Sequence, residues 1–262
     1  MDTFLFTLYA TGYTFLMTAA GAAAVLVTKK PPSQLFTKLS LGFAAGIMIA
    51  ASVWSLLNPA MEQAEKMDTW SAIPVTGGFI LGAAFLALLD TIMPHLHIGS
   101  KQPEGPKSHL SRHQLLFLAI TIHNIPEGMA VGISFAAAAA LGSPEAMSAA
   151  VALTIGMGIQ NIPEGTAVTL PLRSQGTGRA KAFFLGAISG IVEPIAALIV
   201  VFLASYFIPL MPWLLSFAAG AMIYVVVEEL IPEAKLGEHS NLGTIAVLSG
   251  FVIMMILDTS LG

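Results

Sequence analysis

Eight runs of apolar residues, each long enough to cross a lipid bilayer, dominate the pattern of the chain. A spanning helix needs about 20 mostly apolar residues, because the hydrocarbon core is roughly 30 Å thick and a helix rises about 1.5 Å per residue. The runs cover residues 4–28, 35–57, 72–93, 113–140, 145–171, 180–207, 211–231 and 242–260. The pattern predicts an all-α integral membrane protein with eight transmembrane helices, forming a single domain over residues 1–262.

The composition strengthens this prediction and narrows the chemistry. Of 262 residues, 56% are hydrophobic and 10% are charged, whereas soluble domains carry roughly 25% charged residues. The chain has no cysteine, which excludes disulfides and thiolate ligands and leaves metal binding to His, Glu, Asp, Asn, Gln, Met and water. A lipid bilayer is therefore the expected surrounding. Neither nucleic acid nor an organic cofactor is expected, and the absence of a P-loop motif argues against ATP as the driving force.

The basic residues are concentrated in the odd-numbered joints between the predicted helices. These joints contain Lys29, Lys30, Lys38, Lys101, Lys107, Arg112, Arg173, Arg179, Lys181 and Lys235. The even-numbered joints and the termini contain only Lys66. Since cytoplasmic loops carry an excess of Lys and Arg, the distribution predicts that both termini lie outside and that residues 98–112 form a cytoplasmic loop.

A six-residue pattern occurs twice in apolar surroundings. Residues 123–128 read His-Asn-Ile-Pro-Glu-Gly in the predicted fourth helix, and residues 160–165 read Gln-Asn-Ile-Pro-Glu-Gly in the fifth. Because positions i, i+3 and i+4 share one face of a helix, each copy aligns three oxygen or nitrogen donors. A proline within a helix frees the carbonyl four residues earlier, so Pro126 and Pro163 predict kinked helices with spare acceptors beside each glutamate.

The turn at residues 142–144 sets the relative depth of the two copies. A turn this short makes the fourth and fifth helices antiparallel neighbours. His123 and Glu164 are equally far from the turn along the chain and therefore share one depth in the membrane. Glu127 and Gln160 share another depth, one helical turn away. The spacing predicts that two donor stripes face each other deep in the bilayer.

The sixth helix adds a third buried carboxylate, Glu193, which is followed by Pro194. Reflection about the joint at residues 173–179 places Glu193 near the depth of Glu164. Three carboxylates at one depth repel each other and take up protons unless cations are present. A purely structural polar network is a poor use of three buried glutamates. Oxygen and imidazole ligands suit Zn(II), Fe(II), Mn(II), Co(II), Ni(II) or Cd(II) better than Cu(I), so a divalent-metal site is expected.

These paired motifs resemble those of the ZIP (Zrt/Irt-like) family of divalent-metal transporters, in particular its GufA-type bacterial branch, and the resemblance covers essentially the whole chain. It implies a primary metal site formed by His123, Glu127, Gln160, Glu164 and Glu193. It also implies a second, adjacent site, in which Asn124 and Asn161 join the three bridging glutamates. The site would then be a binuclear metal centre.

The resemblance further implies an arrangement that the residues alone do not establish. The first to third helices and the sixth to eighth would form an inverted repeat around the central pair. The first, fourth, fifth and sixth helices would move like an elevator against a scaffold of the second, third, seventh and eighth. A homodimer in the inner membrane of a bacterium is also implied.

Further polar residues are candidates for a route through the protein. Candidates for the entrance are Met48, Ser52 and Asp258. Candidates for the cytoplasmic exit are Asp90, His95, His97, Glu228, Glu229 and Glu233. Ordinary packing of a methionine, an interfacial aspartate and solvated helix ends are the alternative interpretations of these residues.

The function expected from these features is uptake of divalent transition metals into the cytoplasm, with Zn²⁺ first and Fe²⁺, Mn²⁺, Co²⁺ and Cd²⁺ as further substrates. An intramembrane zinc metallohydrolase is one alternative, but the chain has no HExxH motif, and the repeated pattern makes a symmetric cage without an open catalytic face. A passive metal channel and a metal-sensing receptor also remain open. We therefore expect a transport protein and not an enzyme.

Overall fold

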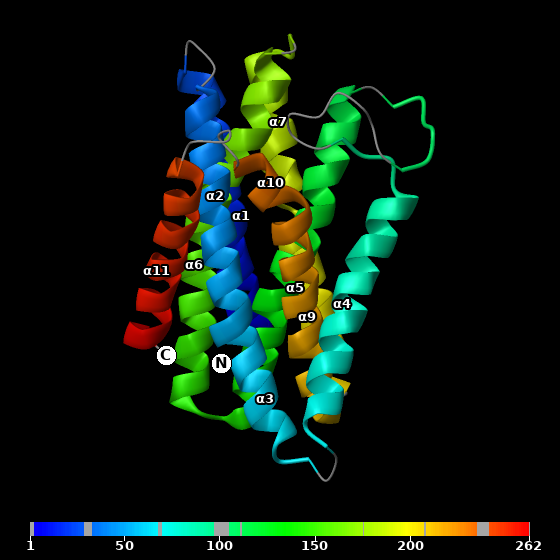
Figure 1. The fold of residues 1–262 in the computed structure, drawn as a ribbon, viewed down its shortest axis with the longest axis vertical. Helices are drawn as coiled ribbons and strands as arrows, with labels where there is room; N and C mark the ends of the chain where they lie inside the picture. Colours follow the sequence, from blue (N-terminus) through cyan, green and yellow to red (C-terminus); the bar gives the residue numbers. More distant parts are fainter. Residues whose placement is uncertain are drawn as a thin grey trace.

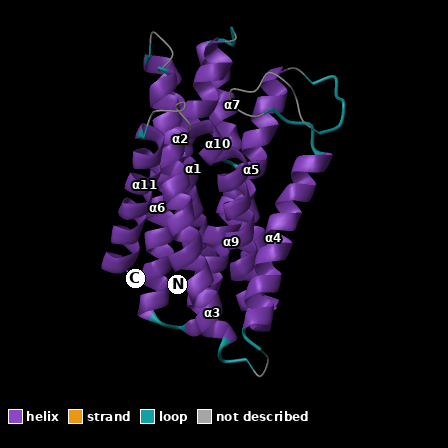
Figure 2. Cartoon of the chain, in the orientation of Figure 1, coloured by secondary structure: helices purple, strands orange, loops and turns teal. Residues whose placement is uncertain are grey.

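The computed structural model is a bundle of long helices that run along a common axis (Figure 1). It describes residues 3–28, 33–67, 70–96, 105–110, 112–174, 176–206, 208–234 and 241–261. Helices account for the regular structure of these ranges, and Figure 2 shows no strand among them. Eight helical spans are long and apolar enough to cross a membrane. The predicted class, an all-α multi-pass membrane protein, is confirmed.

The helices follow the predicted runs closely. The first four spans are α1 (Thr3–Val27), α2 (Gln34–Ala51) with the π-helix η1 (Ser52–Leu57) and α3 (Asn58–Ala64), α4 (Ala72–Ile92), and α5 (Arg112–Leu141). The next two are α6 (Pro144–Ser174) and the pair α7 (Arg179–Ser189) and α8 (Val192–Tyr206). After the 3₁₀ turn η2 (Ile208–Leu210) come α9 (Met211–Val225) with the π-helix η3 (Val226–Leu230) and α10 (Ile231–Ala234), and finally α11 (Leu242–Leu261).

Three spans are interrupted where the sequence predicts uninterrupted helices. In each of them a proline follows the irregular segment. The ring of a proline clashes with the carbonyl four residues earlier, which is residue 55 for Pro59, residue 190 for Pro194 and residue 228 for Pro232. Residues 55 and 228 lie in the π-helices η1 and η3, and residue 190 lies in the break between α7 and α8. A proline thus explains the irregular backbone in each of these three spans.

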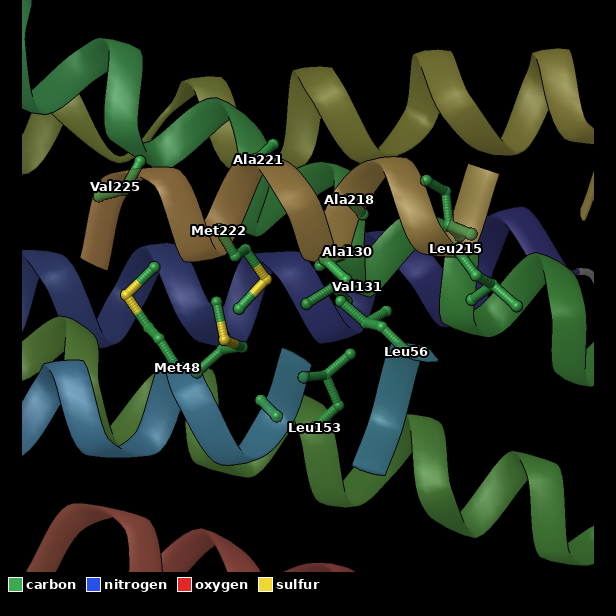
Figure 3. Close-up of a cluster of buried hydrophobic side chains, with 14 of the residues drawn as sticks. Met48, Leu56, Ala130, Val131, Leu153, Leu215, Ala218, Ala221, Met222 and Val225 are labelled. Carbon is green, nitrogen blue, oxygen red and sulfur yellow. The ribbon is translucent and has the colours of Figure 1, made fainter. Parts of the chain in front are cut away.

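The helices pack in two groups. In one group α1 packs on α6 and α7, and α5 packs on α8; in the other group α4 packs on α9, and α11 packs on α2. The groups meet where α2 lies against α6 and α5 lies against α9. Figure 3 shows apolar side chains from both groups in this interface, among them Met48, Val131, Leu153 and Met222.

The helix ends that flank successive joints lie at opposite ends of the bundle, as the distribution of basic residues along the sequence predicts. In Figure 1 both termini lie toward the end of the bundle that holds the turn between α5 and α6. The C-terminal end of α4 and the N-terminal end of α5 lie at the opposite end. The helix ends that flank the odd-numbered joints therefore share one end of the bundle (Figure 1). We call it the basic end, because the sequences of these joints carry nearly all the basic residues.

Candidate metal centre

Glu193 stands in the first turn of α8, directly after the helix break, and is buried. The Asn161 amide nitrogen lies 3.0 Å from each of its two carboxylate oxygens. The Thr18 hydroxyl donates to Glu193 Oε1 at 3.2 Å. The carboxylate is therefore held by side chains from α6 and α1, and the Thr14 side chain of α1 also lies close to it. Thr18 was not singled out by the sequence analysis.

The hydrogen bonds determine the orientation of the two side-chain amides of the second motif, those of Gln160 and Asn161. The Asn161 nitrogen faces the Glu193 carboxylate and, at 3.3 Å, the Thr14 carbonyl, and both groups accept only. Asn161 Oδ1 must therefore face away from them, and it accepts from Gln160 Nε2 at 3.2 Å. This turns Gln160 Oε1 the other way, where it has no hydrogen-bond partner among the described residues.

The first motif also turns its oxygen atoms away from donors. Asn124 Nδ2 donates to the Ser189 carbonyl at 3.2 Å, so Asn124 Oδ1 faces away and lacks a partner within the described part of the chain. Both carboxylate oxygens of Glu127, which is 1% exposed, lack a hydrogen-bond partner there as well. A buried acceptor without a donor costs about 1–3 kcal/mol. Four oxygens of this kind, including Gln160 Oε1, are left without donors, and such oxygens are ligands that a hard or borderline cation accepts.

His123 makes a contact that the sequence analysis did not anticipate. Its Nδ1 forms an ion pair with Glu229 Oε2, a buried carboxylate of η3. The His123 side chain is 13% exposed. Glu229 was predicted to lie on the exit route, separate from the central site. The structure instead joins it directly to the histidine of the first motif.

A small cavity with a volume of about 20 Å³ adjoins the motifs on the side of the basic end. Its polar lining consists of His123, Asn124, Glu164 and Glu229, and apolar side chains of α2, α5, α6, α9 and η3 complete it. Glu127 and Gln160 are not among its lining residues and are fully buried. This agrees with the depth that the spacing predicts, since His123 and Glu164 form the layer nearer the basic end.

The described residues do not gather three or more His, Asp or Glu side chains at metal-binding distance. The contacts already named explain why. Glu193 is held by Asn161 and Thr18, and His123 is held by Glu229. Binding an ion at this centre therefore requires His123 to exchange Glu229 for the ion, and Glu193 to offer lone pairs that its two donors leave free.

The predicted entrance residues lie away from this cavity. Met48 and Ser52 are fully buried, and the Ser52 hydroxyl donates to the Met48 carbonyl at 2.7 Å. Asp258 accepts from the Ser55 hydroxyl at 2.8 Å, which links α11 to η1. Ser55 was not singled out from the sequence. The role of this cluster as an entrance stays a prediction.

The predicted exit residues separate into distinct places. Asp90 Oδ1 pairs with His95 Nε2 at 2.9 Å, and the Tyr224 hydroxyl lies 3.3 Å from Asp90 Oδ2. Glu228 is exposed, beside the buried Glu229. Glu233 lies in α10, and His97 lies outside the described residues. The part of all these residues in an exit route, Glu229 included, also stays a prediction.

Comparisons with known proteins identify the family to which the chain belongs. Residues 97–258 match the family model described as ZIP zinc transporter. The chain is 39% identical to "Zinc transporter ZIP11" of Homo sapiens, and the alignment covers 97% of each chain. It is 41% identical to "Zinc transporter GufA" of Myxococcus xanthus over 94% of each chain. It is 38% identical to "Zinc transporter ZIPB" of Bordetella bronchiseptica over 95% of this chain and 79% of that one. The chain therefore belongs to the ZIP zinc transporter family, in its GufA-type branch.

Proposed function

We propose that this protein carries divalent transition-metal ions into the cytoplasm, with Zn²⁺ as the main substrate and Fe²⁺, Mn²⁺, Co²⁺ and Cd²⁺ as further ones. Relatives that share nearly its whole length are named zinc transporters, which supports a transport role over a catalytic one. The distribution of basic residues supports the basic end as cytoplasmic and both termini as outside. We place the protein in the inner membrane of a bacterium, as a homodimer, on its resemblance to the GufA-type branch.

The observation that carries the proposal is the set of buried oxygen atoms without donors. Asn124, Glu127 and Gln160 contribute four of them, from two helices that bear the same motif. In hydrocarbon surroundings each such group is costly unless a partner arrives. A divalent cation satisfies several at once and also neutralises the repulsion among Glu127, Glu164 and Glu193.

The primary site in this proposal consists of His123, Glu127, Gln160, Glu164 and Glu193. His123 leaves Glu229 and turns to the ion, and Glu193 presents a carboxylate oxygen from the other side. Asn124 and Asn161 flank the primary site as the second position. Because metal binding requires an unprotonated imidazole and ionised carboxylates, uptake is expected to weaken in acid.

A carrier mechanism fits the packing better than a passive channel. The cavity approaches the centre from the basic end only as far as His123 and Glu164, and the layer of Glu127 and Gln160 beyond it is buried. We propose that α1, α5, α6, α7 and α8 move together as a transport bundle against a scaffold of α2, α4, α9 and α11. The apolar interface in Figure 3 supplies a surface without directional bonds along which such a movement can occur.

The exit step in this proposal begins at the contact between His123 and Glu229. Glu229 lies in the cavity wall and faces the histidine from the scaffold side. When His123 releases the ion, Glu229 can take either the ion or the histidine. Asp90 and His95, at the basic end of α4, would take part further along the route.

Metal entry into liposomes that contain the purified protein and a trapped zinc-sensitive dye tests this function. We expect zinc entry with the wild type and its loss in Glu164→Ala and Glu193→Ala. Glu145→Ala removes an exposed glutamate of α6 and should transport like the wild type. Zinc binding without entry in the wild type would contradict transport, and entry that survives both site variants would contradict the proposed centre.

A further inference from the structure

Thr18 occupies an unusual position for a threonine of a membrane helix. Its hydroxyl lies 3.2 Å from Glu193 Oε1 and equally 3.2 Å from the Thr14 carbonyl of its own helix. Its side chain is 2% exposed. A hydroxyl has one hydrogen to donate, so Thr18 can hold Glu193 or return to its own backbone. The hydrogen bond from Thr18 to the Glu193 carboxylate can therefore form or break without movement of a helix.

The fold provides room for Thr18 at this place. A Cβ atom at Gly165, the last residue of the second motif, would collide with the Thr18 carbonyl. A Cβ atom at Gly190, in the break before α8, would lie 3.1 Å from the Thr18 side chain. Two glycines thus allow α1 to approach both α6 and the turn that delivers Glu193.

The first motif makes the matching approach to α8. A Cβ atom at Gly128 would collide with the backbone of Glu193. The glycine of one motif therefore admits α8 at Glu193, and the glycine of the other admits α1 at Thr18. Thr18 holds on α1 the place that Glu193 holds on α8. Where α8 supplies a carboxylate, α1 supplies the hydroxyl that orients it.

We infer that Thr18 is a positioning residue of the metal centre, one that holds Glu193 Oε1 so that the remaining lone pairs of the carboxylate are directed at the ion. This inference rests on the proposed function. A carboxylate has about four lone-pair sites, so Thr18 can keep its hydrogen bond while Glu193 binds metal. Groups that hydrogen-bond a ligating carboxylate typically contribute 10- to 100-fold to metal affinity or activity.

Zinc binding by the purified full-length protein, measured by competition with a chromophoric chelator, tests this role. Thr18→Val keeps the shape of the side chain and removes the donor, so its Kd for zinc should rise about 10-fold. Thr18→Ala should show the same rise, and Thr18→Ser, which keeps the hydroxyl, should bind like the wild type. In liposomes the KM of Thr18→Val should rise with its Kd while kcat stays close to that of the wild type.

Thr11→Val is the matched control. Thr11 is buried on the same face of α1, and its hydroxyl donates to the Thr7 carbonyl at 2.7 Å. The Thr11→Val substitution should leave the zinc affinity unchanged. A wild-type Kd in Thr18→Val, an equal loss in Thr11→Val, or a Ser variant as weak as Val would each overturn the inference. Glu193→Ala separates the two hypotheses: if it loses zinc and Thr18→Val does not, only the role of Thr18 fails, whereas if it binds zinc normally the proposed centre fails.

Discussion

The two copies of the six-residue motif differ at one position in sequence and at nearly every contact in structure. In the copy on α5, His123 pairs with Glu229 and Asn124 donates to the Ser189 carbonyl. In the copy on α6, Gln160 donates to Asn161, which in turn holds Glu193. One histidine therefore connects the first copy to the scaffold, whereas the second copy makes its polar contacts within the bundle.

This difference teaches that a repeated motif need not have a repeated function. The second copy and α1 hold Glu193 through neutral donors, and in the proposed mechanism these donors stay in place when an ion arrives. In the proposed mechanism the first copy contributes the one imidazole of the two motifs, which exchanges a carboxylate partner for the ion. We interpret the copy on α6 as the holding side of the centre and the copy on α5 as the releasing side.

The largest effect is expected where the two sides meet, at Glu127. Its two carboxylate oxygens lack hydrogen-bond partners among the described residues. When Glu127 is replaced by glutamine, no existing contact of these oxygens compensates for the loss of the negative charge. Since changes to groups that merely support a ligand typically cost 10- to 100-fold, Glu127→Gln should weaken zinc binding by more than about 100-fold. Chelator competition measures this, with Glu145→Gln as the exposed control. Near-normal zinc affinity in Glu127→Gln would show that the buried oxygens do not bind the ion.

A smaller effect is expected when the two copies are made identical. His123→Gln gives two amide motifs, and because imidazole is a better zinc ligand than an amide oxygen, zinc affinity should fall about 10- to 100-fold. Binding of Mn²⁺, which prefers oxygen ligands, should fall less. Competition between Zn²⁺ and Mn²⁺ for the purified variants measures the shift.

Gln160→His, the reciprocal variant, sharpens the same comparison. Two imidazoles should bind zinc at least as tightly as one, but the new ring cannot repeat the amide contact to Asn161. If holding and releasing are separate tasks, this variant should bind zinc well and transport it slowly. Equal zinc affinity in His123→Gln and the wild type would contradict the assignment of His123 as a ligand.

The spans and the depth of the motifs could be predicted because helix rise and bilayer thickness determine both. The pairing of His123 with Glu164 at one depth follows from their equal distance to the turn at residues 142–144. The contact from Glu229 to His123 could not be predicted in this way. A π-helical segment such as η3 changes the register, and one residue of register corresponds to about 100° of rotation around a helix.

Thr18 shows a second limit of sequence reasoning. Threonines at positions 7, 11, 14 and 18 all place a hydroxyl near a carbonyl of their own helix, as membrane threonines commonly do. What distinguishes Thr18 is that it lies next to the break between α7 and α8. The ring of Pro194 causes this break, because it clashes with the carbonyl of Gly190, four residues earlier. The sequence contains both signals, but their meeting depends on which helices are neighbours in the bundle.

The smallest effect, and the most specific, is expected at Glu229. In the proposed mechanism this buried carboxylate holds the histidine in its released position in the empty protein. Glu229→Gln keeps a hydrogen-bonding side chain there, so the loss is the difference between a charged and a neutral hydrogen bond, about 1 kcal/mol, which corresponds to a factor of about 5. Glu229→Gln should therefore bind zinc up to about 5-fold more tightly and release it correspondingly more slowly. Stopped-flow release of zinc to an excess chelator measures the rate, and equilibrium competition measures the affinity. Glu228→Gln changes the exposed neighbour on the same π-helix and should alter neither quantity. If Glu229→Gln instead weakened zinc binding as strongly as Glu127→Gln, Glu229 would be a ligand of the resting centre. Holding and releasing would then have to be assigned to the two sides of the His123 ring, and no longer to the copies on α6 and α5.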